Sequence, residues 1–227
     1  MGHAWAKQPA GRGTVVAEAE GRQSTGPAGF YVSFGKPLID VSLAAVLLIL
    51  LAPIMALTML ALRLELGRGI VITQRRVGQY GVTFAMFKLR TMHCERRVSD
   101  AESYAGPERR VSHKSIDDPR HTRVGRVVRK WSLDEVPQLI NVIRGDMSLV
   151  GPRPELAIIV REYEPWQHSR HLVKPGLTGL WQTTARRQTD ELMRYRTDID
   201  IDYIQRLSLG TDLAILVRTP FAMRYGR

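Results

Sequence analysis

The stretch VSLAAVLLILLAPIMALTMLAL, residues 41–62, carries no charged side chain and decides how the chain is organised. A helix rises about 1.5 Å per residue, so this stretch is long enough to cross the hydrocarbon core of a bilayer, which is about 30 Å thick. The alternative is a buried helix of a soluble domain. Such helices seldom stay apolar on every face over this length. The stretch therefore predicts a membrane-embedded helix.

Pro53 lies near the middle of this stretch, where it removes a backbone donor and clashes with the carbonyl of Ile49. We expect the helix to kink there. Lys36 precedes the stretch, and Arg63 and Arg68 follow it, so both flanks are basic and the positive-inside rule gives no orientation. Two arrangements fit this pattern: a kinked helix that crosses once, and a re-entrant helix that leaves on the face where it entered.

The membrane helix divides the chain into three parts. Residues 1–35 are rich in Gly, Ala and polar residues and predict a poorly ordered leader. This leader lacks the features of a secretory signal peptide. Residues 36–66 contain the membrane helix, and residues 67–227 are numerous enough for one packed domain.

We expect this domain to begin with a β-hairpin. Residues 69–74 (GIVITQ) and 82–92 (VTFAMFKLRTM) have strand patterns, and the turn residues GQYG at 78–81 lie between them. Residues 93–120 are polar and predict an exposed connection.

Helices and rigid loops are expected in the rest of the domain. A helix should begin at Ser132 and end at Gly145, with an apolar face of Val136, Leu139, Ile140 and Ile143. Residues 149–154 (LVGPRP) and 174–182 (KPGLTGLWQ) predict rigid loops, and the segment between them has a helical pattern. Helices are expected from residue 190 onward, with an apolar stripe suited to a membrane surface that comprises Leu207, Leu209, Leu213, Leu216 and Val217.

The charge of the chain points to an anionic partner. Lys and Arg outnumber Asp and Glu by 33 to 22, which gives a formal net charge of +11. Nucleic acid, an anionic membrane surface and phosphorylated substrates all fit such a balance. Nucleic-acid binding does not explain the apolar helix, and no reading motif is present. The single cysteine, Cys94, excludes an intrachain disulfide.

The sequence Ser132-Leu133-Asp134-Glu135 has two interpretations. It matches a capping box, in which Ser132 and Glu135 satisfy the first turn of a helix. It also places a carboxylate beside several cations and a helix N-terminus, which favours the ionised form. An ionised Asp134 is a competent nucleophile toward phosphorus, or a ligand for magnesium beside phosphate oxygens.

Basic residues are spread along the domain as candidate phosphate ligands. Any one of them is more often a solvated surface residue than a ligand. Arg153 is the exception, because prolines on both sides restrict its backbone and preorganise the guanidinium. The acidic pattern Asp198-Ile199-Asp200 resembles a nucleotide-sugar metal motif, but the polar face of a helix explains it equally well. The candidate phosphate ligands are Lys88, Arg90, Arg129, Arg153 and Arg186.

Taken together, these motifs resemble the bacterial sugar transferases, also called monotopic phosphoglycosyl transferases. The most specific match is the long block DDPRHTRVGRVVRKWSLDEVPQLINVIRGDMSLVGPRPE at residues 117–155. The shorter matches are QRRVG (74–78), FKLRTM (87–92), KPGLTGLWQ (174–182) and DYIQRLSLGTDLAIL (202–216). The chain is similar in size to the compact enzymes that initiate exopolysaccharide repeat units by transferring a galactosyl or glucosyl phosphate.

The resemblance implies a mechanism. Asp134 and Glu135 match the catalytic Asp-Glu dyad of the family. Asp134 would attack a UDP-hexose, release UMP and pass hexose 1-phosphate to undecaprenyl phosphate, with Mg²⁺ at the dyad. Lys88, Arg129 and Arg153 match basic positions of the family.

The resemblance also implies a location. Pro53 matches the helix break that returns a re-entrant helix to the cytoplasmic face of the inner membrane. Downstream glycosyltransferases are candidate partners, and nucleic acid is not.

The chain departs from the family pattern at two places. Ala52 stands where the family often has Ser before the proline, so a hydroxyl that supports the bend is missing. Residues 183–187 read TTARR, without the usual Gly and Asn, while Arg186 keeps the family arginine.

The expected fold class is therefore a membrane-associated α/β protein. It has a Pro-kinked re-entrant helix, a small and mainly helical catalytic domain with a β-hairpin, and C-terminal amphipathic helices. The rival hypothesis is a membrane-tethered module that binds anionic lipid or protein without catalysis.

Overall fold

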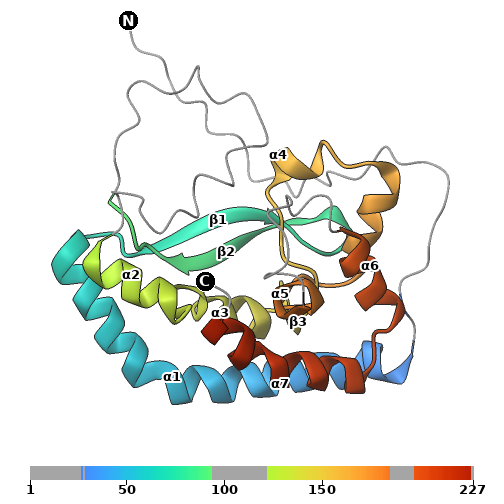
Figure 1. The fold of residues 1–227 in the computed structure, drawn as a ribbon, viewed down its shortest axis with the longest axis horizontal. Coiled ribbons are helices and arrows are strands. Elements are labelled where there is room, and N and C mark those ends of the chain that lie inside the picture. The colour runs from blue at the N-terminus through green and yellow to red at the C-terminus, as the bar shows by residue number, and fades with distance from the viewer. Residues whose placement is uncertain (1–26, 28, 94–121, 185–196, 226–227) are drawn as a thin grey trace, which may run out of the picture.

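The computed structural model describes residues 27, 29–93, 122–184 and 197–225, which form a mixed α/β structure with one long N-terminal helix (Figure 1). This helix, α1 (Lys36–Leu66), follows a short π-helical turn, η1 (Tyr31–Gly35). Among the described residues it belongs to the one helical segment that is long and apolar enough to cross a membrane. The expectation of a membrane-compatible helix is confirmed.

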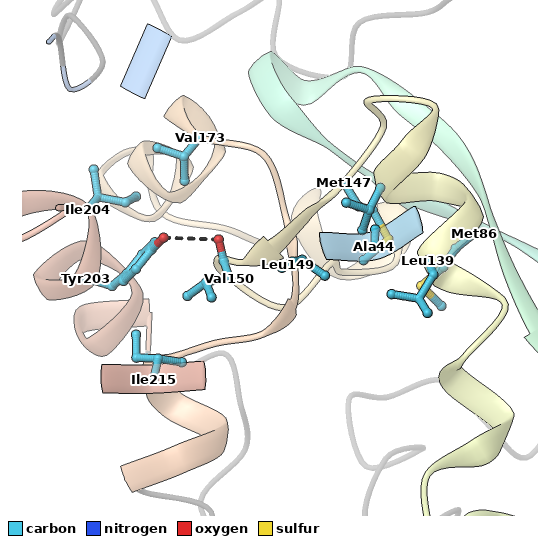
Figure 2. Close-up of a cluster of buried hydrophobic side chains, with 11 residues drawn as sticks. Ala44, Met86, Leu139, Met147, Leu149, Val150, Val173, Tyr203, Ile204 and Ile215 are labelled. Carbon is cyan, nitrogen blue, oxygen red and sulfur yellow. Dashed lines mark hydrogen bonds between the residues drawn. The ribbon is translucent and has the colours of Figure 1, made fainter. Parts of the chain in front are cut away.

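The two halves of α1 pack against different parts of the domain. Before Pro53, Ala44 joins the cluster of buried side chains that contains Leu149, drawn in Figure 2. After Pro53, Leu62 joins a second cluster with Leu89. In Figure 1 the cyan half of α1 lies along α2 (Arg123–Lys130), and α1 also packs against α3 (Gln138–Ile143). Pro53 thus separates two packing environments within one helix.

Both ends of α1 are attached to the domain. At its start, the ammonium group of Lys36 lies 2.6 Å from Oδ2 of Asp212 in α7, and both side chains are buried. Tyr31 donates a hydrogen bond to the same oxygen at 2.6 Å, and Tyr203 donates to Oδ1 at 2.8 Å. Buried charges of this kind are tolerated because each is paired and hydrogen-bonded.

The end of α1 is held by polar contacts of another kind. The Glu65 carboxylate accepts hydrogen bonds from the backbone N–H groups of Arg123 and Val124, at 2.9 and 3.1 Å. These are the first residues of α2 (Arg123–Lys130), so Glu65 satisfies donors that a helix start leaves unpaired. The domain therefore contacts α1 at both of its ends.

Several large apolar side chains of α1 face solvent. Ile49, Leu57 and Leu64 are 73, 69 and 80% exposed. Contiguous apolar surface of this extent on a folded protein marks an interaction site. Helix α7 (Leu209–Tyr225) adds Leu213 and Val217 to the exposed apolar side chains. The predicted C-terminal stripe is confirmed only in part, because Leu207 and Leu216 pack inward against the main core.

The predicted β-hairpin is confirmed. Strands β1 (Val71–Val77) and β2 (Thr83–Leu89) pair antiparallel, and Val77 lies opposite Thr83 next to the turn. Two consecutive positive φ angles in the turn, 52° at Tyr80 and 75° at Gly81, reverse the chain.

The predicted loops at residues 149–154 and 174–182 are wrong in part, because each contributes to a short strand. Strands β3 (Ser148–Val150) and β4 (Gly176–Thr178) pair in parallel. The two backbones approach so closely that a Cβ on Gly176 would lie 2.1 Å from the Gly151 nitrogen. In Figure 2 the Tyr203 hydroxyl donates to the carbonyl of Val150 at the end of β3, at 3.0 Å.

The predicted helix from Ser132 is also corrected. Ser132 has a φ of 53° and its side chain caps no helix, so the capping box is absent. A 3-10 turn, η5 (Leu133–Glu135), is followed by Pro137 and the short helix α3 (Gln138–Ile143). Leu139 is buried as expected, whereas the expected core residues Ile140 and Ile143 are 40 and 38% exposed. Gly145, with a φ of 79°, follows the end of α3 as predicted.

The C-terminal part contains short helices and turns around the two-stranded parallel sheet. The helical pattern between residues 155 and 170 gives only α4 (Ala157–Val160) and the 3-10 turn η6 (Pro165–Leu172). Helix α5 (Leu180–Thr184) follows β4, and α6 (Thr197–Gln205) precedes α7, which confirms the helices expected near the C-terminus. Expectations for residues 1–26, 94–121 and 185–196 lie outside the described residues.

Candidate active site

Asp134 lies in the turn η5 between α2 and α3, and it is only 3% exposed. The ammonium group of Lys88, on β2, lies 2.9 Å from its Oδ2 atom. Its Oδ1 atom is buried and has no hydrogen-bond partner. A buried acceptor without a donor costs about 1–3 kcal/mol, which a folded protein seldom accepts without a functional reason. This unpaired oxygen makes Asp134 a candidate for a functional role.

The local backbone explains how Asp134 reaches this position. Ser132 adopts the left-handed conformation, which is uncommon for a residue with a Cβ and costs about 1 kcal/mol or more. It turns the chain sharply after α2, and the Glu135 N–H then bonds to the Ser132 carbonyl at 3.0 Å. Strained residues of this kind cluster at functional sites.

Hydrogen bonds between α3 and the backbone of β2 position Lys88. The buried side chain of Asn141 accepts a hydrogen bond from the Phe87 N–H at 3.0 Å and donates to the Ala85 carbonyl at 2.8 Å. These two bonds fix the strand on either side of Met86 and hold the adjoining Lys88 against Asp134. Sequence reasoning missed Asn141; its only signal was an amide within an apolar run.

Glu135 has its own cationic partner. The Nη2 atom of Arg153, in the loop after β3, lies 2.9 Å from Oε1 of Glu135. The Glu135 carboxylate raises the pKa of the Arg153 guanidinium above its ordinary value. Arg153 is therefore charged at any physiological pH. The structure brings Asp134, Glu135, Lys88 and Arg153 together at one site.

The other expected phosphate ligands are placed differently. Arg90 donates from Nη2 to the carbonyls of Leu66 and Arg68, at 2.8 Å each, and thereby ties β2 to the end of α1. Arg129 lies in the last turn of α2, with Nη1 3.7 Å from the Met92 sulfur. Arg186 lies outside the described residues.

The acidic pattern on α6 does not form a separate metal motif. Asp200 is buried and lies 2.6 Å from Arg170, and Asp202 lies 2.8 Å from Arg206. Both carboxylates are therefore engaged in ion pairs within the domain. Asp198, the second residue of α6, is exposed.

The dyad is the expected place for a divalent cation. The described residues contain no group of three or more His, Cys, Asp and Glu side chains that could hold a metal. Magnesium commonly binds through one or two carboxylates, with waters and substrate phosphates as the remaining ligands. The unpaired Oδ1 of Asp134 and the adjacent Glu135 carboxylate fit that pattern.

This geometry can now be compared with known proteins. The family model described as bacterial sugar transferase matches residues 31–226, which is nearly the whole chain. The chain belongs to the bacterial sugar transferase family. This match confirms the family that the sequence motifs indicated.

The chain is also similar to several named bacterial proteins. A protein of Caulobacter vibrioides named UDP-glucose:undecaprenyl-phosphate glucose-1-phosphate transferase is 45% identical over 194 residues, which cover 83% of this chain and 69% of the relative. The exopolysaccharide production protein ExoY of Sinorhizobium fredii is 39% identical, over 87% of this chain and 88% of the relative. An undecaprenyl-phosphate galactose phosphotransferase of Salmonella typhimurium is 36% identical, over 82% of this chain and 40% of the relative.

These relatives confirm that this bacterial sugar transferase is an enzyme of the phosphoglycosyl transferase class. Family membership and the apolar helix α1 together indicate association with a membrane.

Proposed function

We propose that the enzyme transfers hexose 1-phosphate from a UDP-hexose to undecaprenyl phosphate through a covalent intermediate on Asp134. The products are UMP and undecaprenyl diphosphate-hexose, which would start the assembly of an exopolysaccharide repeat unit. The observation that carries this proposal is the environment of Asp134: a buried carboxylate with Oδ2 held by Lys88 and Oδ1 without a partner.

In the first step, Oδ1 of Asp134 attacks the β-phosphorus of the UDP-hexose. The new bond joins Oδ1 to phosphorus, and the bond between that phosphorus and the oxygen bridging to the α-phosphate breaks. UMP leaves with the bridging oxygen, and the hexose phosphate stays on the enzyme. The Lys88 ammonium keeps Oδ2 oriented away from the reacting phosphorus.

In the second step, an oxygen of undecaprenyl phosphate attacks the phosphorus of the intermediate. The bond from phosphorus to Oδ1 breaks, and the Asp134 carboxylate is restored. The two anionic substrates would repel each other strongly in one site. A covalent intermediate lets them occupy it in turn, which divides one difficult reaction into two easier ones.

The basic side chains around the dyad would compensate the substrate charge. Arg153 is fixed on Glu135 and presents a planar guanidinium that suits phosphate oxygens. Arg129 and Arg186 are further candidates from the family pattern. Asp134 and Glu135 would hold Mg²⁺, and a bound divalent ion supplies neutralisation of the diphosphate charge.

The membrane arrangement that we propose is a re-entrant helix. A straight 31-residue helix is about 46 Å long, and a crossing would put its ends on opposite faces of the bilayer. Here Lys36 at one end and Glu65 at the other both contact the same polar domain. The exposed apolar residues around Pro53 would then enter the membrane as the bend of the helix. We infer that both ends and the catalytic domain lie on the cytoplasmic face of the inner membrane.

The covalent step can be tested by trapping. Purified enzyme is mixed with a UDP-hexose labelled in the sugar, quenched in acid, digested and mapped. We expect the label on the peptide that contains Asp134, and none in Asp134→Asn, which keeps the shape of the side chain but is not a nucleophile. Asp198→Asn, on the exposed face of α6, is the matched control and should label like the wild type. Label on another peptide would rule out the proposed nucleophile.

The donor and acceptor need a separate measurement. A panel of UDP-sugars, with and without undecaprenyl phosphate, is assayed for UMP release in the presence of Mg²⁺ and after its removal with a chelator. We expect multiple turnovers only with the lipid acceptor and the metal. An enzyme that released no UMP from any donor would favour the rival hypothesis of a non-catalytic binding module.

A further inference from the structure

The loop that carries Arg153 is held by an unusual set of hydrogen bonds. Four successive backbone carbonyls, at residues 152–155, each accept a hydrogen bond from a different residue. The Gly176 N–H donates to Pro152 at 2.8 Å, and the Val77 N–H donates to Glu155 at 2.9 Å. The two carbonyls between them accept from arginine side chains.

These two arginines come from different parts of the fold. Arg76, on β1, donates from Nη1 to the Pro154 carbonyl at 3.4 Å, which is a long contact. Arg170, in η6, donates from Nη2 to the Arg153 carbonyl at 2.9 Å. The shorter of the two hydrogen bonds is therefore made to Arg153, the residue whose guanidinium contacts Glu135.

Arg170 is itself held firmly. Its side chain is buried, and Nη2 lies 2.6 Å from Oδ2 of Asp200 on α6. Its Nη1 atom donates to the hydroxyl of Tyr163. Burial alone would lower the pKa of the Arg170 guanidinium, but Asp200 and Tyr163 raise this pKa above its ordinary value, so the group stays charged. The same contacts limit its movement.

These contacts form a continuous path to the dyad. Asp200 and Tyr163 hold Arg170, and Arg170 holds the backbone of Arg153. The Arg153 guanidinium then lies 2.9 Å from Glu135. Pro152 and Pro154 restrict the backbone on both sides, so the Arg170 contact fixes the point from which the Arg153 side chain extends.

We propose that Arg170 is a positioning residue for Arg153, with Asp200 and Tyr163 as its supports. This inference rests on the proposed function, in which Arg153 and Glu135 receive the diphosphate. Arg170 touches neither dyad carboxylate and acts only through Arg153. Small displacements of a positioned group can lower a rate by as much as about 100-fold. Loss of the Arg170 contact should therefore lower the rate of the reaction.

The rival explanation is that Arg170 only stabilises the fold. A double-mutant cycle separates the two explanations, because residues that act through one another have non-additive effects. The cycle compares wild type, Arg170→Lys, Arg153→Ala and the double variant. Single-turnover release of UMP from a labelled UDP-hexose gives the rate at saturating donor, and a donor titration gives the apparent affinity.

We expect Arg170→Lys to lower the saturating rate by roughly 10-fold when Arg153 is present. In the Arg153→Ala background, the same change should lower it by less than about 2-fold. A loss of the same factor in both backgrounds would overturn the positioning role and leave a purely structural one.

A second variant keeps the test decisive if Arg170→Lys does not fold. Tyr163→Phe removes one acceptor of Arg170 and keeps the buried ring. It should lower the rate by roughly 3-fold, again only when Arg153 is present. Asp202→Asn, two residues after Asp200 on the same helix, breaks an exposed ion pair and should leave the rate unchanged. A Tyr163→Phe loss that persists without Arg153 would overturn the proposal.

Failure of the proposed function looks different. A wild-type enzyme that releases no UMP from any UDP-hexose contradicts the proposed function. A wild-type enzyme that is active, with additive effects in the cycle, contradicts only the role of Arg170.

Discussion

The Nζ atom of Lys88 lies 2.9 Å from Oδ2 of Asp134, while Oδ1 of the same carboxylate has no hydrogen-bond partner. The cation therefore makes the two oxygens of the carboxylate inequivalent. Lys88 holds Oδ2, and in the proposed mechanism Oδ1 would form the bond to phosphorus. Glu135 pairs with a different cation, since its Oε1 meets Arg153.

Replacing Lys88 by Met should lower the rate of UMP release by roughly 100-fold, the range found when one preorganised charge is removed from an active site. Met keeps the apolar stem but removes the ammonium group, so the Asp134 side chain loses the cation that lies 2.9 Å from Oδ2. The measurement is single-turnover UMP release. Arg206→Met, at an exposed position of α6, is the control and should retain full activity. Similar rates for Lys88→Met and wild type would mean that Lys88 has no part in catalysis.

Asp212→Asn should destabilise the protein by about 3 kcal/mol, because the buried Lys36 ammonium loses its closer carboxylate partner, at 2.6 Å, and keeps only Asp40 at 3.7 Å. Denaturant unfolding in detergent measures the change. Asp202→Asn breaks a more exposed pair on α6 and should cost less than about 1 kcal/mol. Equal losses for the two variants would show that burial of the Lys36 pair contributes nothing to stability.

The buried side chain of His171, in η6, predicts a loss of stability in mild acid. Burial, together with Arg170 and His168, lowers the pKa of His171 to about 3. The unfolded chain binds a proton at His171 below its ordinary pKa of 6.5, and the folded chain does not, so stability falls as pH drops through 6.5. Between pH 7.5 and 5.5 this one group should remove about 1.4 kcal/mol.

His171→Gln should remove that part of the pH dependence, as denaturant unfolding at the two pH values would measure. The comparison must be made between variants, because Asp200 acts in the opposite direction. Burial raises the pKa of Asp200 to about 6, so the folded chain binds its proton more readily than the unfolded chain. His168, whose pKa burial lowers, acts in the same direction as His171. An unchanged pH dependence in His171→Gln would contradict the assignment.

Pro53→Ala should shift part of the population from the proposed re-entrant helix to a crossing helix, because alanine restores the backbone N–H that proline lacks and removes the cause of the expected kink. Single cysteines at Ser33 and Arg68, in a background with Cys94 replaced, are labelled by a reagent that does not cross the membrane. Both sites should be protected in the parent protein when the reagent is outside the cell. In Pro53→Ala, labelling at the Ser33 position should rise while the Arg68 position stays protected.

Pro220→Ala supplies the control for this experiment, since Pro220 also lies inside a helix, α7, but outside the apolar segment. It should leave both sites protected. Labelling of the Ser33 site in the parent protein would exclude the re-entrant arrangement and indicate a true crossing.

The sequence was a good guide where local pattern determined structure. Three features that depend on neighbours in the chain were predicted correctly. They are the apolar helix at residues 41–62, the hairpin turn at 78–81 and the end of a helix at Gly145. Prediction from the sequence failed where contacts between residues far apart in the chain determine the structure. Strands β3 and β4 have only three residues each and exist because two glycine-containing segments approach closely. The left-handed Ser132 and the Pro137 that follows break a helical pattern that looked continuous.

The same division applies to the site. Motifs located Asp134, Glu135, Lys88 and Arg153, and the structure brings these four side chains together. Motifs could not separate Lys88, on β2, from Arg90, which directly follows this strand, although the two contact different partners. Pairwise contacts over tens of residues, such as those of Asn141 and of Arg170, left no periodic trace in the sequence.

The attachment of Lys36 to Asp212 has a consequence for biosynthesis. The two residues are 176 positions apart, so α1 leaves the ribosome and meets the bilayer long before Asp212 has been made. Until then, Asp40, four residues after Lys36, is the carboxylate within reach of its ammonium group. A chain truncated before α7 would lack the attachment at the start of α1, while Glu65 could still hold the end of α1 to α2.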